Sequence, residues 1–343
     1  MSDGTPIDVP AMLRSQRDDR GRFVHPWPLE EGASRGLRDL LRWQRDRVRN
    51  GVVPDPPPHA FTVATPDVAQ PRVARDELRI TWIGHATFLI QLAGINVLTD
   101  PVWSARASPL PWAGPRRLVP AALPFAELPP IDAIVLSHDH YDHLDAPTVR
   151  RLQRRFGAQL HWITPLGYRR WLRRRSVRTV TELDWWGDAS IDTAAGKLHV
   201  RAVPAQHWSK RTPFNERTRL WASFVLSAGG RRVYFCGDSG WFTGFGSIAR
   251  LGAFDATLLP IGAYEPRWFM KPAHMNPEEA VRAYIALGAT GLFVGMHWGT
   301  FRLTDEPAFE PPERTAAVWR EHGLPAERLW LPRHGETRTI RHA

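Results

Sequence analysis

The stretch Ser137-His138-Asp139-His140-Tyr141-Asp142-His143 holds three histidines and an aspartate in the pattern His-x-His-x-Asp-His. An apolar run precedes it and a helical pattern follows, so the sequence predicts a loop at a strand end, where side chains converge outside a sheet edge. Imidazole nitrogens and carboxylate oxygens are the ligands that Zn²⁺ binds where thiolates are absent. The spacing therefore predicts that His138 and His140 hold one ion, while Asp142 and His143 reach a second.

Three isolated donors follow later predicted strands and complete the predicted metal ligands. His207 follows the run 197–203, Asp238 lies between two glycines after 232–235, and His297 ends the apolar segment 292–296. Each one alone is also typical of a capping or hydrogen-bonded polar group. Because all three lie at strand-to-loop junctions, we expect them to meet the first motif at one edge of the fold.

The pattern of apolar runs and turn residues predicts the fold class. We expect strands over 78–83, 87–92, 95–99, 133–137, 197–203, 220–226, 232–235, 256–260 and 291–295. Helices are expected over 146–156 with Asp145 as N-cap, near 242–251, and after Asn276, which precedes a proline and two glutamates. Two strand-rich halves that each finish in helices predict an αββα sandwich of two mixed β-sheets flanked by helices, an α/β (α+β) fold.

The first 75 residues differ from the rest in composition. They are rich in proline, as at 54–58, and contain one helical pattern near 34–49. We interpret residues 1–75 as an arm packed on or near a main domain of residues 76–343.

Composition and charge exclude several classes of protein. The single cysteine, Cys236, excludes an intramolecular disulfide and a cysteine-built zinc cluster. No apolar run is long enough to span a membrane, and residues 1–20 show no signal peptide, which favours a cytoplasmic protein that can also bind peripherally to a membrane. The net charge is +10, but only three of the 45 basic residues are lysines, an arginine bias that GC-rich coding produces by itself. The densest basic stretch, 169–175, is typical of an exposed helix end, with a phosphate or lipid-headgroup site as the alternative.

Beyond the metal motif, the chain resembles the metallo-β-lactamase-fold hydrolases and, within them, the N-acyl-phosphatidylethanolamine-hydrolysing phospholipase D group. The resemblance covers about residues 22–337. The most specific strings are Asp184-Trp185-Trp186 and the segment 262–270, and further matches lie at 23–28, 81–87, 98–101, 107–109 and 334–336.

The resemblance implies roles for individual residues around two Zn²⁺ ions. It implies that His138, His140 and His207 bind the first zinc, that Asp142, His143 and His297 bind the second, and that Asp238 bridges both. Asp142 and His274 are the implied catalytic residues, with His274 as proton donor to the leaving group. His85 and Asp100 are expected to orient the ligands, and Tyr264 and Trp268 to contact substrate.

The implied activity is a zinc-dependent phosphodiesterase that uses a metal-bridged hydroxide to convert a phospholipid into phosphatidic acid and an N-acylethanolamine. The same fold also hosts hydrolases of nucleotides, nucleic acids and lactones, so another substrate is the alternative, followed by a non-catalytic metal-binding regulator. No basic and aromatic platform for RNA is visible, which makes nucleic acid the weaker partner. Peripheral membrane contact and a homodimer remain open.

Overall fold

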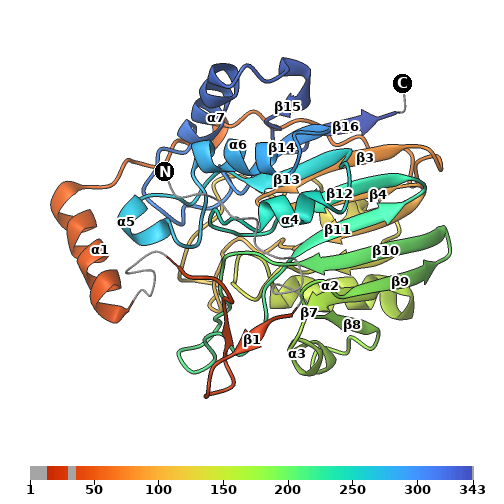
Figure 1. Cartoon of the computed structure of the whole chain (residues 1–343), viewed down its shortest axis with the longest axis horizontal. Helices are drawn as coiled ribbons and strands as arrows, with labels where there is room; N and C mark the ends of the chain where they lie inside the picture. The colour runs from red at the N-terminus through yellow and green to blue at the C-terminus, as the bar shows by residue number, and fades with distance from the viewer. Residues whose placement is uncertain (1–13, 30–35, 342–343) are drawn as a thin grey trace.

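Two seven-stranded β-sheets lie face to face in the computed structural model, and helices cover their outer sides (Figure 1). The structure describes residues 14–29 and 36–341. This architecture confirms the αββα sandwich that the sequence predicts.

The first sheet is mixed. Its order is β16 (Thr337–Ile340), β3 (Leu78–Gly84), β4 (Thr87–Leu92), β5 (Ile95–Thr99), β6 (Ala133–Val135), β7 (His161–Pro165) and β8 (Val180–Leu183). Pairing is antiparallel from β16 to β5 and parallel from β5 to β8.

The second sheet repeats this plan. Its order is β15 (Leu329–Trp330), β14 (Leu292–Met296), β13 (Ala256–Pro260), β12 (Arg231–Phe235), β11 (Ser223–Ala228), β10 (Gly196–Val203) and β9 (Asp188–Thr193). Strands β9 to β12 pair antiparallel, and β12 to β15 pair parallel. In each sheet, the carboxyl ends of the parallel strands therefore lie at the same edge of the sheet.

Strands β3 to β6 of the first sheet are buried along their whole length, and their alternate side chains point to opposite faces. In β4, Phe88 and Ile90 join the core between the sheets, whereas Leu89 belongs to a separate cluster on the outer side. The outer cluster also contains Val149 and Leu152 of α2 (Ala146–Phe156), so this helix covers the first sheet.

The other helices have local sequence causes. Helix α3 (Arg169–Arg173) buries Leu172 in the same outer cluster. On the second sheet lie α4 (Phe245–Ala249), α6 (Pro277–Ala286) and α7 (Glu310–Glu321) (Figure 1). The predicted start of α6 is confirmed, because the Asn276 side chain accepts from Glu279 N at 3.0 Å and Glu279 accepts from Asn276 N at 3.2 Å.

Several element boundaries were predicted correctly, and others need correction. Strands β4, β5 and β13 and helix α2 begin and end at the predicted residues. Helix α4 is shorter than the predicted 242–251. Strands β7, β8 and β9 were not predicted, and neither were β15 and β16, which follow β14. The edge strand β9 is largely exposed and the sequence of β16 is Thr-Arg-Thr-Ile, so neither has the apolar run on which the prediction depends.

The N-terminal segment contacts the sandwich at several points. Phe23 in β2 (Phe23–Val24), which pairs with β1 (Gln16–Arg17), is buried in the core between the sheets. Helix α1 (Leu37–Asn50) lies at one end of the molecule (Figure 1), where Trp43 Nε1 donates to Asp305 Oδ2 at 2.5 Å. Residues 34 and 35 of the predicted helix lie outside the described residues. The division of the chain at residue 75 stays a prediction.

Among the described residues, none of the helices combines the length and the apolar character needed to cross a bilayer.

Candidate metal centre

The structure brings the seven side chains predicted as metal ligands together at one edge of the sandwich. Their loops follow β6, β10, β12 and β14, whose ends meet there. Each side chain is at least partly buried, and most are fully buried. The prediction that strand ends would gather these donors is therefore confirmed as geometry, while metal ligation stays a prediction.

One group of donors consists of His138, His140, His207 and Asp238. His140 Nδ1 lies 2.9 Å from His138 Nε2 and 3.2 Å from His207 Nε2. Asp238 Oδ2 lies 3.8 Å from His138 Nε2 and 3.7 Å from His207 Nε2. Ligands about 2.0–2.1 Å from a tetrahedral zinc ion are separated by about 3.3 Å, so this group has the size of a zinc site.

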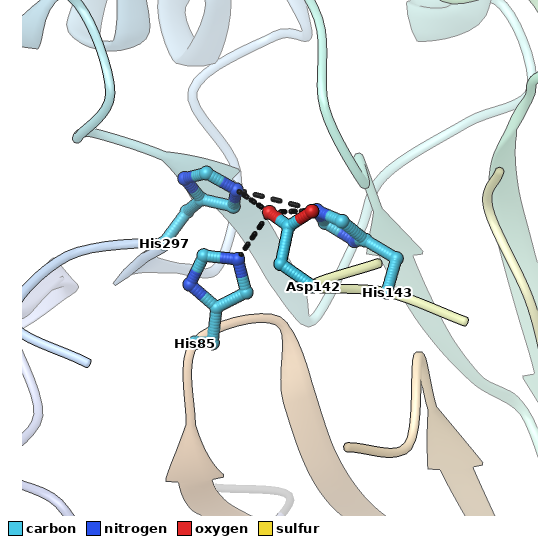
Figure 2. Close-up of side chains that lie close together, drawn as sticks. All are labelled: His85, Asp142, His143 and His297. Atoms are coloured by element: carbon cyan, nitrogen blue, oxygen red, sulfur yellow. Dashed lines mark hydrogen bonds and ion pairs between the residues drawn. The ribbon is translucent and has the colours of Figure 1, made fainter. Parts of the chain in front are cut away.

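A second group consists of His85, Asp142, His143 and His297 (Figure 2). Asp142 Oδ2 lies between the three rings, 2.8 Å from His85 Nε2, 3.3 Å from His143 Nε2 and 3.4 Å from His297 Nε2. His143 Nε2 and His297 Nε2 are 3.2 Å apart. These spacings also match the separation expected between the ligands of one ion.

Asp238 connects the two groups. Besides its contacts to the first group, its Oδ2 lies 3.2 Å from His143 Nε2, and its Oδ1 lies 3.1 Å from His297 Nε2. Oδ1 is nevertheless buried without a hydrogen-bond partner among the described residues. A buried carboxylate oxygen without a partner is costly, and a bound cation would remove that cost. The donor set therefore fits a centre with two metal ions.

The outer nitrogens of three rings are held by fixed acceptors or hydroxyls. Asp100 Oδ2 lies 2.7 Å from His143 Nδ1, and the Ser137 hydroxyl lies 2.9 Å from His138 Nδ1 while donating to Asp100 at 2.5 Å. His207 Nδ1 donates to the Ala273 carbonyl at 3.0 Å. Such bonds fix the ring orientation and leave the inner nitrogen free to bind a metal. Ser137 was missed by the sequence reasoning, although it directly precedes the motif.

His85 was predicted to orient ligands, and the structure places it within the second group. Its Nε2 bonds Asp142, and its Nδ1 is buried without a partner among the described residues. Its φ is +59°, and His297 has a φ of +64°, a left-handed conformation that is strained for residues with a side chain. Strained backbone of this kind clusters at functional sites.

The electrostatics of the two groups differ. Burial lowers the pKa of His138 and of His207 well below the usual value, so both rings are neutral. Burial also acts against the charge on His297, but the carboxylates of Asp238 and Asp142 raise its pKa to about 9. The same carboxylates raise the pKa of His143 well above its usual value. Without metal, protons on the second group thus balance the two carboxylates.

His274 lies beside the centre. Its Nδ1 is 3.9 Å from Asp238 Oδ2, and its ring centroid is 5.0 Å from that of His207. The backbone is fixed, since His274 N donates to the Met270 carbonyl at 3.0 Å and Arg267 donates to the His274 carbonyl at 2.9 Å. Burial lowers the pKa of His274 to about 4, so the ring is neutral at pH 7.

The two predicted substrate contacts lie farther out. Tyr264 is fully buried, and its hydroxyl donates to Glu310 Oε1 at 2.7 Å, so this placement gives no support to a substrate contact. Trp268 in α5 (Arg267–Met270) is partly exposed, and the Arg42 guanidinium lies 4.4 Å from its ring centroid. Its contact with substrate stays a prediction.

Trp27 from the N-terminal segment packs on the main domain beside the centre, and the sequence did not predict its link to two loops of the centre. Its Nε1 donates to Gln206 Oε1 at 3.0 Å, and Gln206 Nε2 donates to the Pro272 carbonyl at 2.9 Å. These two bonds connect the loops that carry His207 and His274. Trp27 belongs to the segment 23–28, and the match of this segment to the phospholipase D group was the feature of the sequence that could have indicated its role.

The model of the Beta-lactamase superfamily domain matches residues 95–298, a segment that contains nearly all of these donors. The chain belongs to the β-lactamase superfamily. It is 42% identical to the "N-acyl-phosphatidylethanolamine-hydrolyzing phospholipase D 1" of Caenorhabditis elegans over 68% of this chain and 67% of that protein. The resemblance to the metallo-β-lactamase-fold hydrolases and to the phospholipase D group, stated from the sequence, is therefore confirmed.

Solved structures support the fold of this β-lactamase superfamily member. The metallo hydrolase Igni18 of Ignicoccus hospitalis aligns to this chain with a TM-score of 0.58 and 22% identity, and the alignment covers 78% of this chain and 100% of the Igni18 chain. An isothiocyanate hydrolase from Delia radicum gut bacteria aligns with a TM-score of 0.60 and 20% identity, and this alignment covers 77% of this chain and 99% of the hydrolase chain. At these identities the likeness concerns the metallo-β-lactamase fold alone.

Proposed function

We propose that this superfamily member is a phosphodiesterase with two Zn²⁺ ions that hydrolyses N-acyl phosphatidylethanolamine to phosphatidic acid and an N-acylethanolamine. The observation that carries the proposal is the position of Asp238, whose carboxylate lies 3.1–3.8 Å from ring nitrogens of both donor groups. The substrate class rests on the relative of that name.

We assign the side chains as the sequence predicted. His138, His140 and His207 would hold one ion, Asp142, His143 and His297 the other, and Asp238 both. When bound, the two ions supply Lewis-acid polarisation of the phosphoryl group and lower the pKa of water toward neutrality. Nitrogen and oxygen donors without thiolate suit zinc.

His85, Asp100 and His274 would orient the metal ligands and the substrate. His85 and Asp100 hold Asp142 and His143 through bonds of 2.8 and 2.7 Å. His274 is neutral, so in this proposal its ring donates a hydrogen bond to the leaving oxygen, and the proton on that nitrogen stabilises the developing negative charge.

The aromatic ring of Trp208 lies beside the centre and supports the proposal of an amphiphilic substrate. The Trp208 ring centroid lies 5.0 Å from that of His140 and 6.4 Å from that of His274. Trp208 is only partly buried, so its indole can cover apolar parts of a substrate near the scissile bond.

The test is a mass-spectrometric product analysis with zinc-loaded protein and N-acyl phosphatidylethanolamine in mixed micelles. Asp238→Asn is the inactive variant, and Asp188→Asn, at an exposed position in β9, is the matched control. We expect phosphatidic acid and N-acylethanolamine from wild type and Asp188→Asn only. Hydrolysis of an aryl phosphodiester without lipid cleavage would reject the lipid substrate and retain the hydrolase. Full activity of Asp238→Asn would reject the metal assignment.

A further inference from the structure

Side chains of the His-Asp motif alternate between two environments. His138 and His140 face the metal centre, whereas Asp139 and Tyr141 contact arginines. Tyr141 lines a cleft of about 640 Å³ that none of the seven predicted metal ligands lines. We call it the arginine cleft, because five arginines line it: Arg106, Arg150, Arg175, Arg211 and Arg219.

The arginines reach the cleft from separate elements. Arg150 lies in α2, Arg175 follows α3, and Arg211 and Arg219 lie between β10 and β11. Helices α2 and α3 lie on the same side of the first sheet, where both join the outer cluster (Figure 1). The tertiary fold, not a single basic run, therefore assembles this charge.

Aromatic rings hold two of the guanidinium groups in place. Arg175 Cζ lies 3.4 Å from the Trp171 ring centroid, and Arg211 Cζ lies 4.1 Å from that of Tyr141. Arg211 also donates to the carbonyls of Asp139 and Leu144 at 2.8 and 2.6 Å. Stacking and carbonyl bonds fix these groups without neutralising their charge.

Carboxylates compensate little of this charge. Within residues 14–29 and 36–341, no carboxylate forms an ion pair with Arg150, Arg175 or Arg211, and Asp139 pairs only with Arg219, at 2.6 Å. Asp145 lines the cleft and keeps its negative charge while it accepts hydrogen bonds from the Ser104 and Thr148 hydroxyls, so the five lining arginines face one lining carboxylate.

Arg175 shows the cost of this arrangement. Its Nε is buried without a hydrogen-bond partner among the described residues. Burial, and then the charges of Arg150 and Arg211, lower its pKa to about 10. Like charges held together in a partly buried cleft favour the binding of an anion.

We propose that the arginine cleft binds a phosphate group at a second site, separate from the metal centre. Guanidinium forks pair with phosphate oxygens two at a time, and a phosphate offers enough oxygens for several arginines that approach from different directions. A cleft of about 640 Å³ accommodates a phosphate with its substituent. The phosphate can belong to a lipid headgroup or be free in solution, and the recognising chemistry is the same.

The test is calorimetric titration of the full-length protein with inorganic phosphate at constant ionic strength. The cleft variant is Arg150→Gln with Arg175→Gln, and the matched control is Arg173→Gln with Arg178→Gln, at exposed positions that do not line the cleft. We expect the Kd of the cleft variant to rise at least about tenfold, as loss of charge-assisted hydrogen bonds requires. The control variant should bind like wild type.

A second comparison separates this site from the proposed catalytic centre. Asp238→Asn should retain phosphate binding, because Asp238 does not line the cleft. Loss of binding in Asp238→Asn with full binding in the cleft variant would place the phosphate at the metal centre and overturn the proposal. Since no turnover is measured, failure of the proposed function leaves this test intact.

Vesicle sedimentation distinguishes the two sources of phosphate. Phosphatidylcholine vesicles with and without phosphatidic acid are compared for wild type, the cleft variant and the control variant. Binding that needs both phosphatidic acid and the cleft arginines supports a lipid headgroup, and calorimetric binding of inorganic phosphate alone supports a free phosphate. Equal behaviour of the cleft and control variants in both assays would overturn the proposal.

Discussion

The two halves of the candidate metal centre use similar side chains but differ in charge. His138 and His207 are neutral, and their outer nitrogens face a hydroxyl and a backbone carbonyl. In the other half, the carboxylates of Asp238, Asp142 and Asp100 lie within 3.3 Å of His143 and raise its pKa. Once the rings of the second half have lost their protons, a cation there meets more negative charge, and we expect tighter metal binding in the second half at alkaline pH.

The largest effect should come from removing the carboxylate that the halves share. Asp238→Asn should empty both halves, because Asp238 lies within 3.8 Å of ring nitrogens in each. Zinc measured by mass spectrometry after dialysis should fall from about two ions per chain to nearly none. Turnover should fall about a thousandfold or more. An unchanged zinc content would contradict the shared role, and Asp188→Asn serves as the control.

A selective effect should follow from Asp100→Asn. This change removes the carboxylate 2.7 Å from His143 Nδ1, so the second half should lose about 10–100-fold in metal affinity. Competition with a chromophoric chelator would show a large loss of affinity for one ion and a smaller loss for the other, because Asp100 also contacts the Ser137 hydroxyl beside His138. Equal weakening of both ions would show that the halves do not act separately.

Proton release tests the charge difference directly. The pKa of His297 is raised to about 9 and that of His143 is raised well above its usual value, so both rings carry protons at pH 7 without metal. Zinc binding should release about two protons, and the affinity should fall as the pH falls. Calorimetry in buffers of different ionisation enthalpy measures this number, and a heat independent of the buffer would contradict it.

The smallest effect concerns the first half. Ser137→Ala removes the hydroxyl 2.9 Å from His138 Nδ1 but leaves all carboxylates. One neutral hydrogen bond contributes about 1 kcal/mol, so the affinity of the first half should fall about fivefold. The chelator competition used for Asp100→Asn measures it. A loss as large as that of Asp100→Asn would mean that the hydroxyl acts mainly through Asp100, which it also contacts.

The sequence predicted that these donors meet because each follows a recognisable strand, as Asp238 follows β12 and His297 follows β14. It could not predict how closely His85 approaches, which depends on how the turn after β3 packs against the loop after β14. His297 N donates to the His85 carbonyl at 3.1 Å, a contact between residues far apart in sequence.

The arginine cleft was also beyond sequence analysis. The basic run 169–175 was visible, but Arg150 and Arg219 join Arg175 only when α2 and the loop after β10 pack beside it. Edge strands such as β9 were missed for a related reason. Hydrogen bonding to the neighbouring strand β10 makes β9 a strand, and its sequence contains no apolar run that would indicate this.

The bond from Trp27 to Gln206 bears on how small an active version of this protein can be. A truncation that starts at residue 76 would retain all seven donors and both sheets, but it would lose the indole that holds Gln206 beside His207. It would also uncover the core position that Phe23 fills. We therefore expect a chain that starts at residue 76 to be less stable and less active than one that starts at or before residue 23, because only the longer chain keeps both contacts.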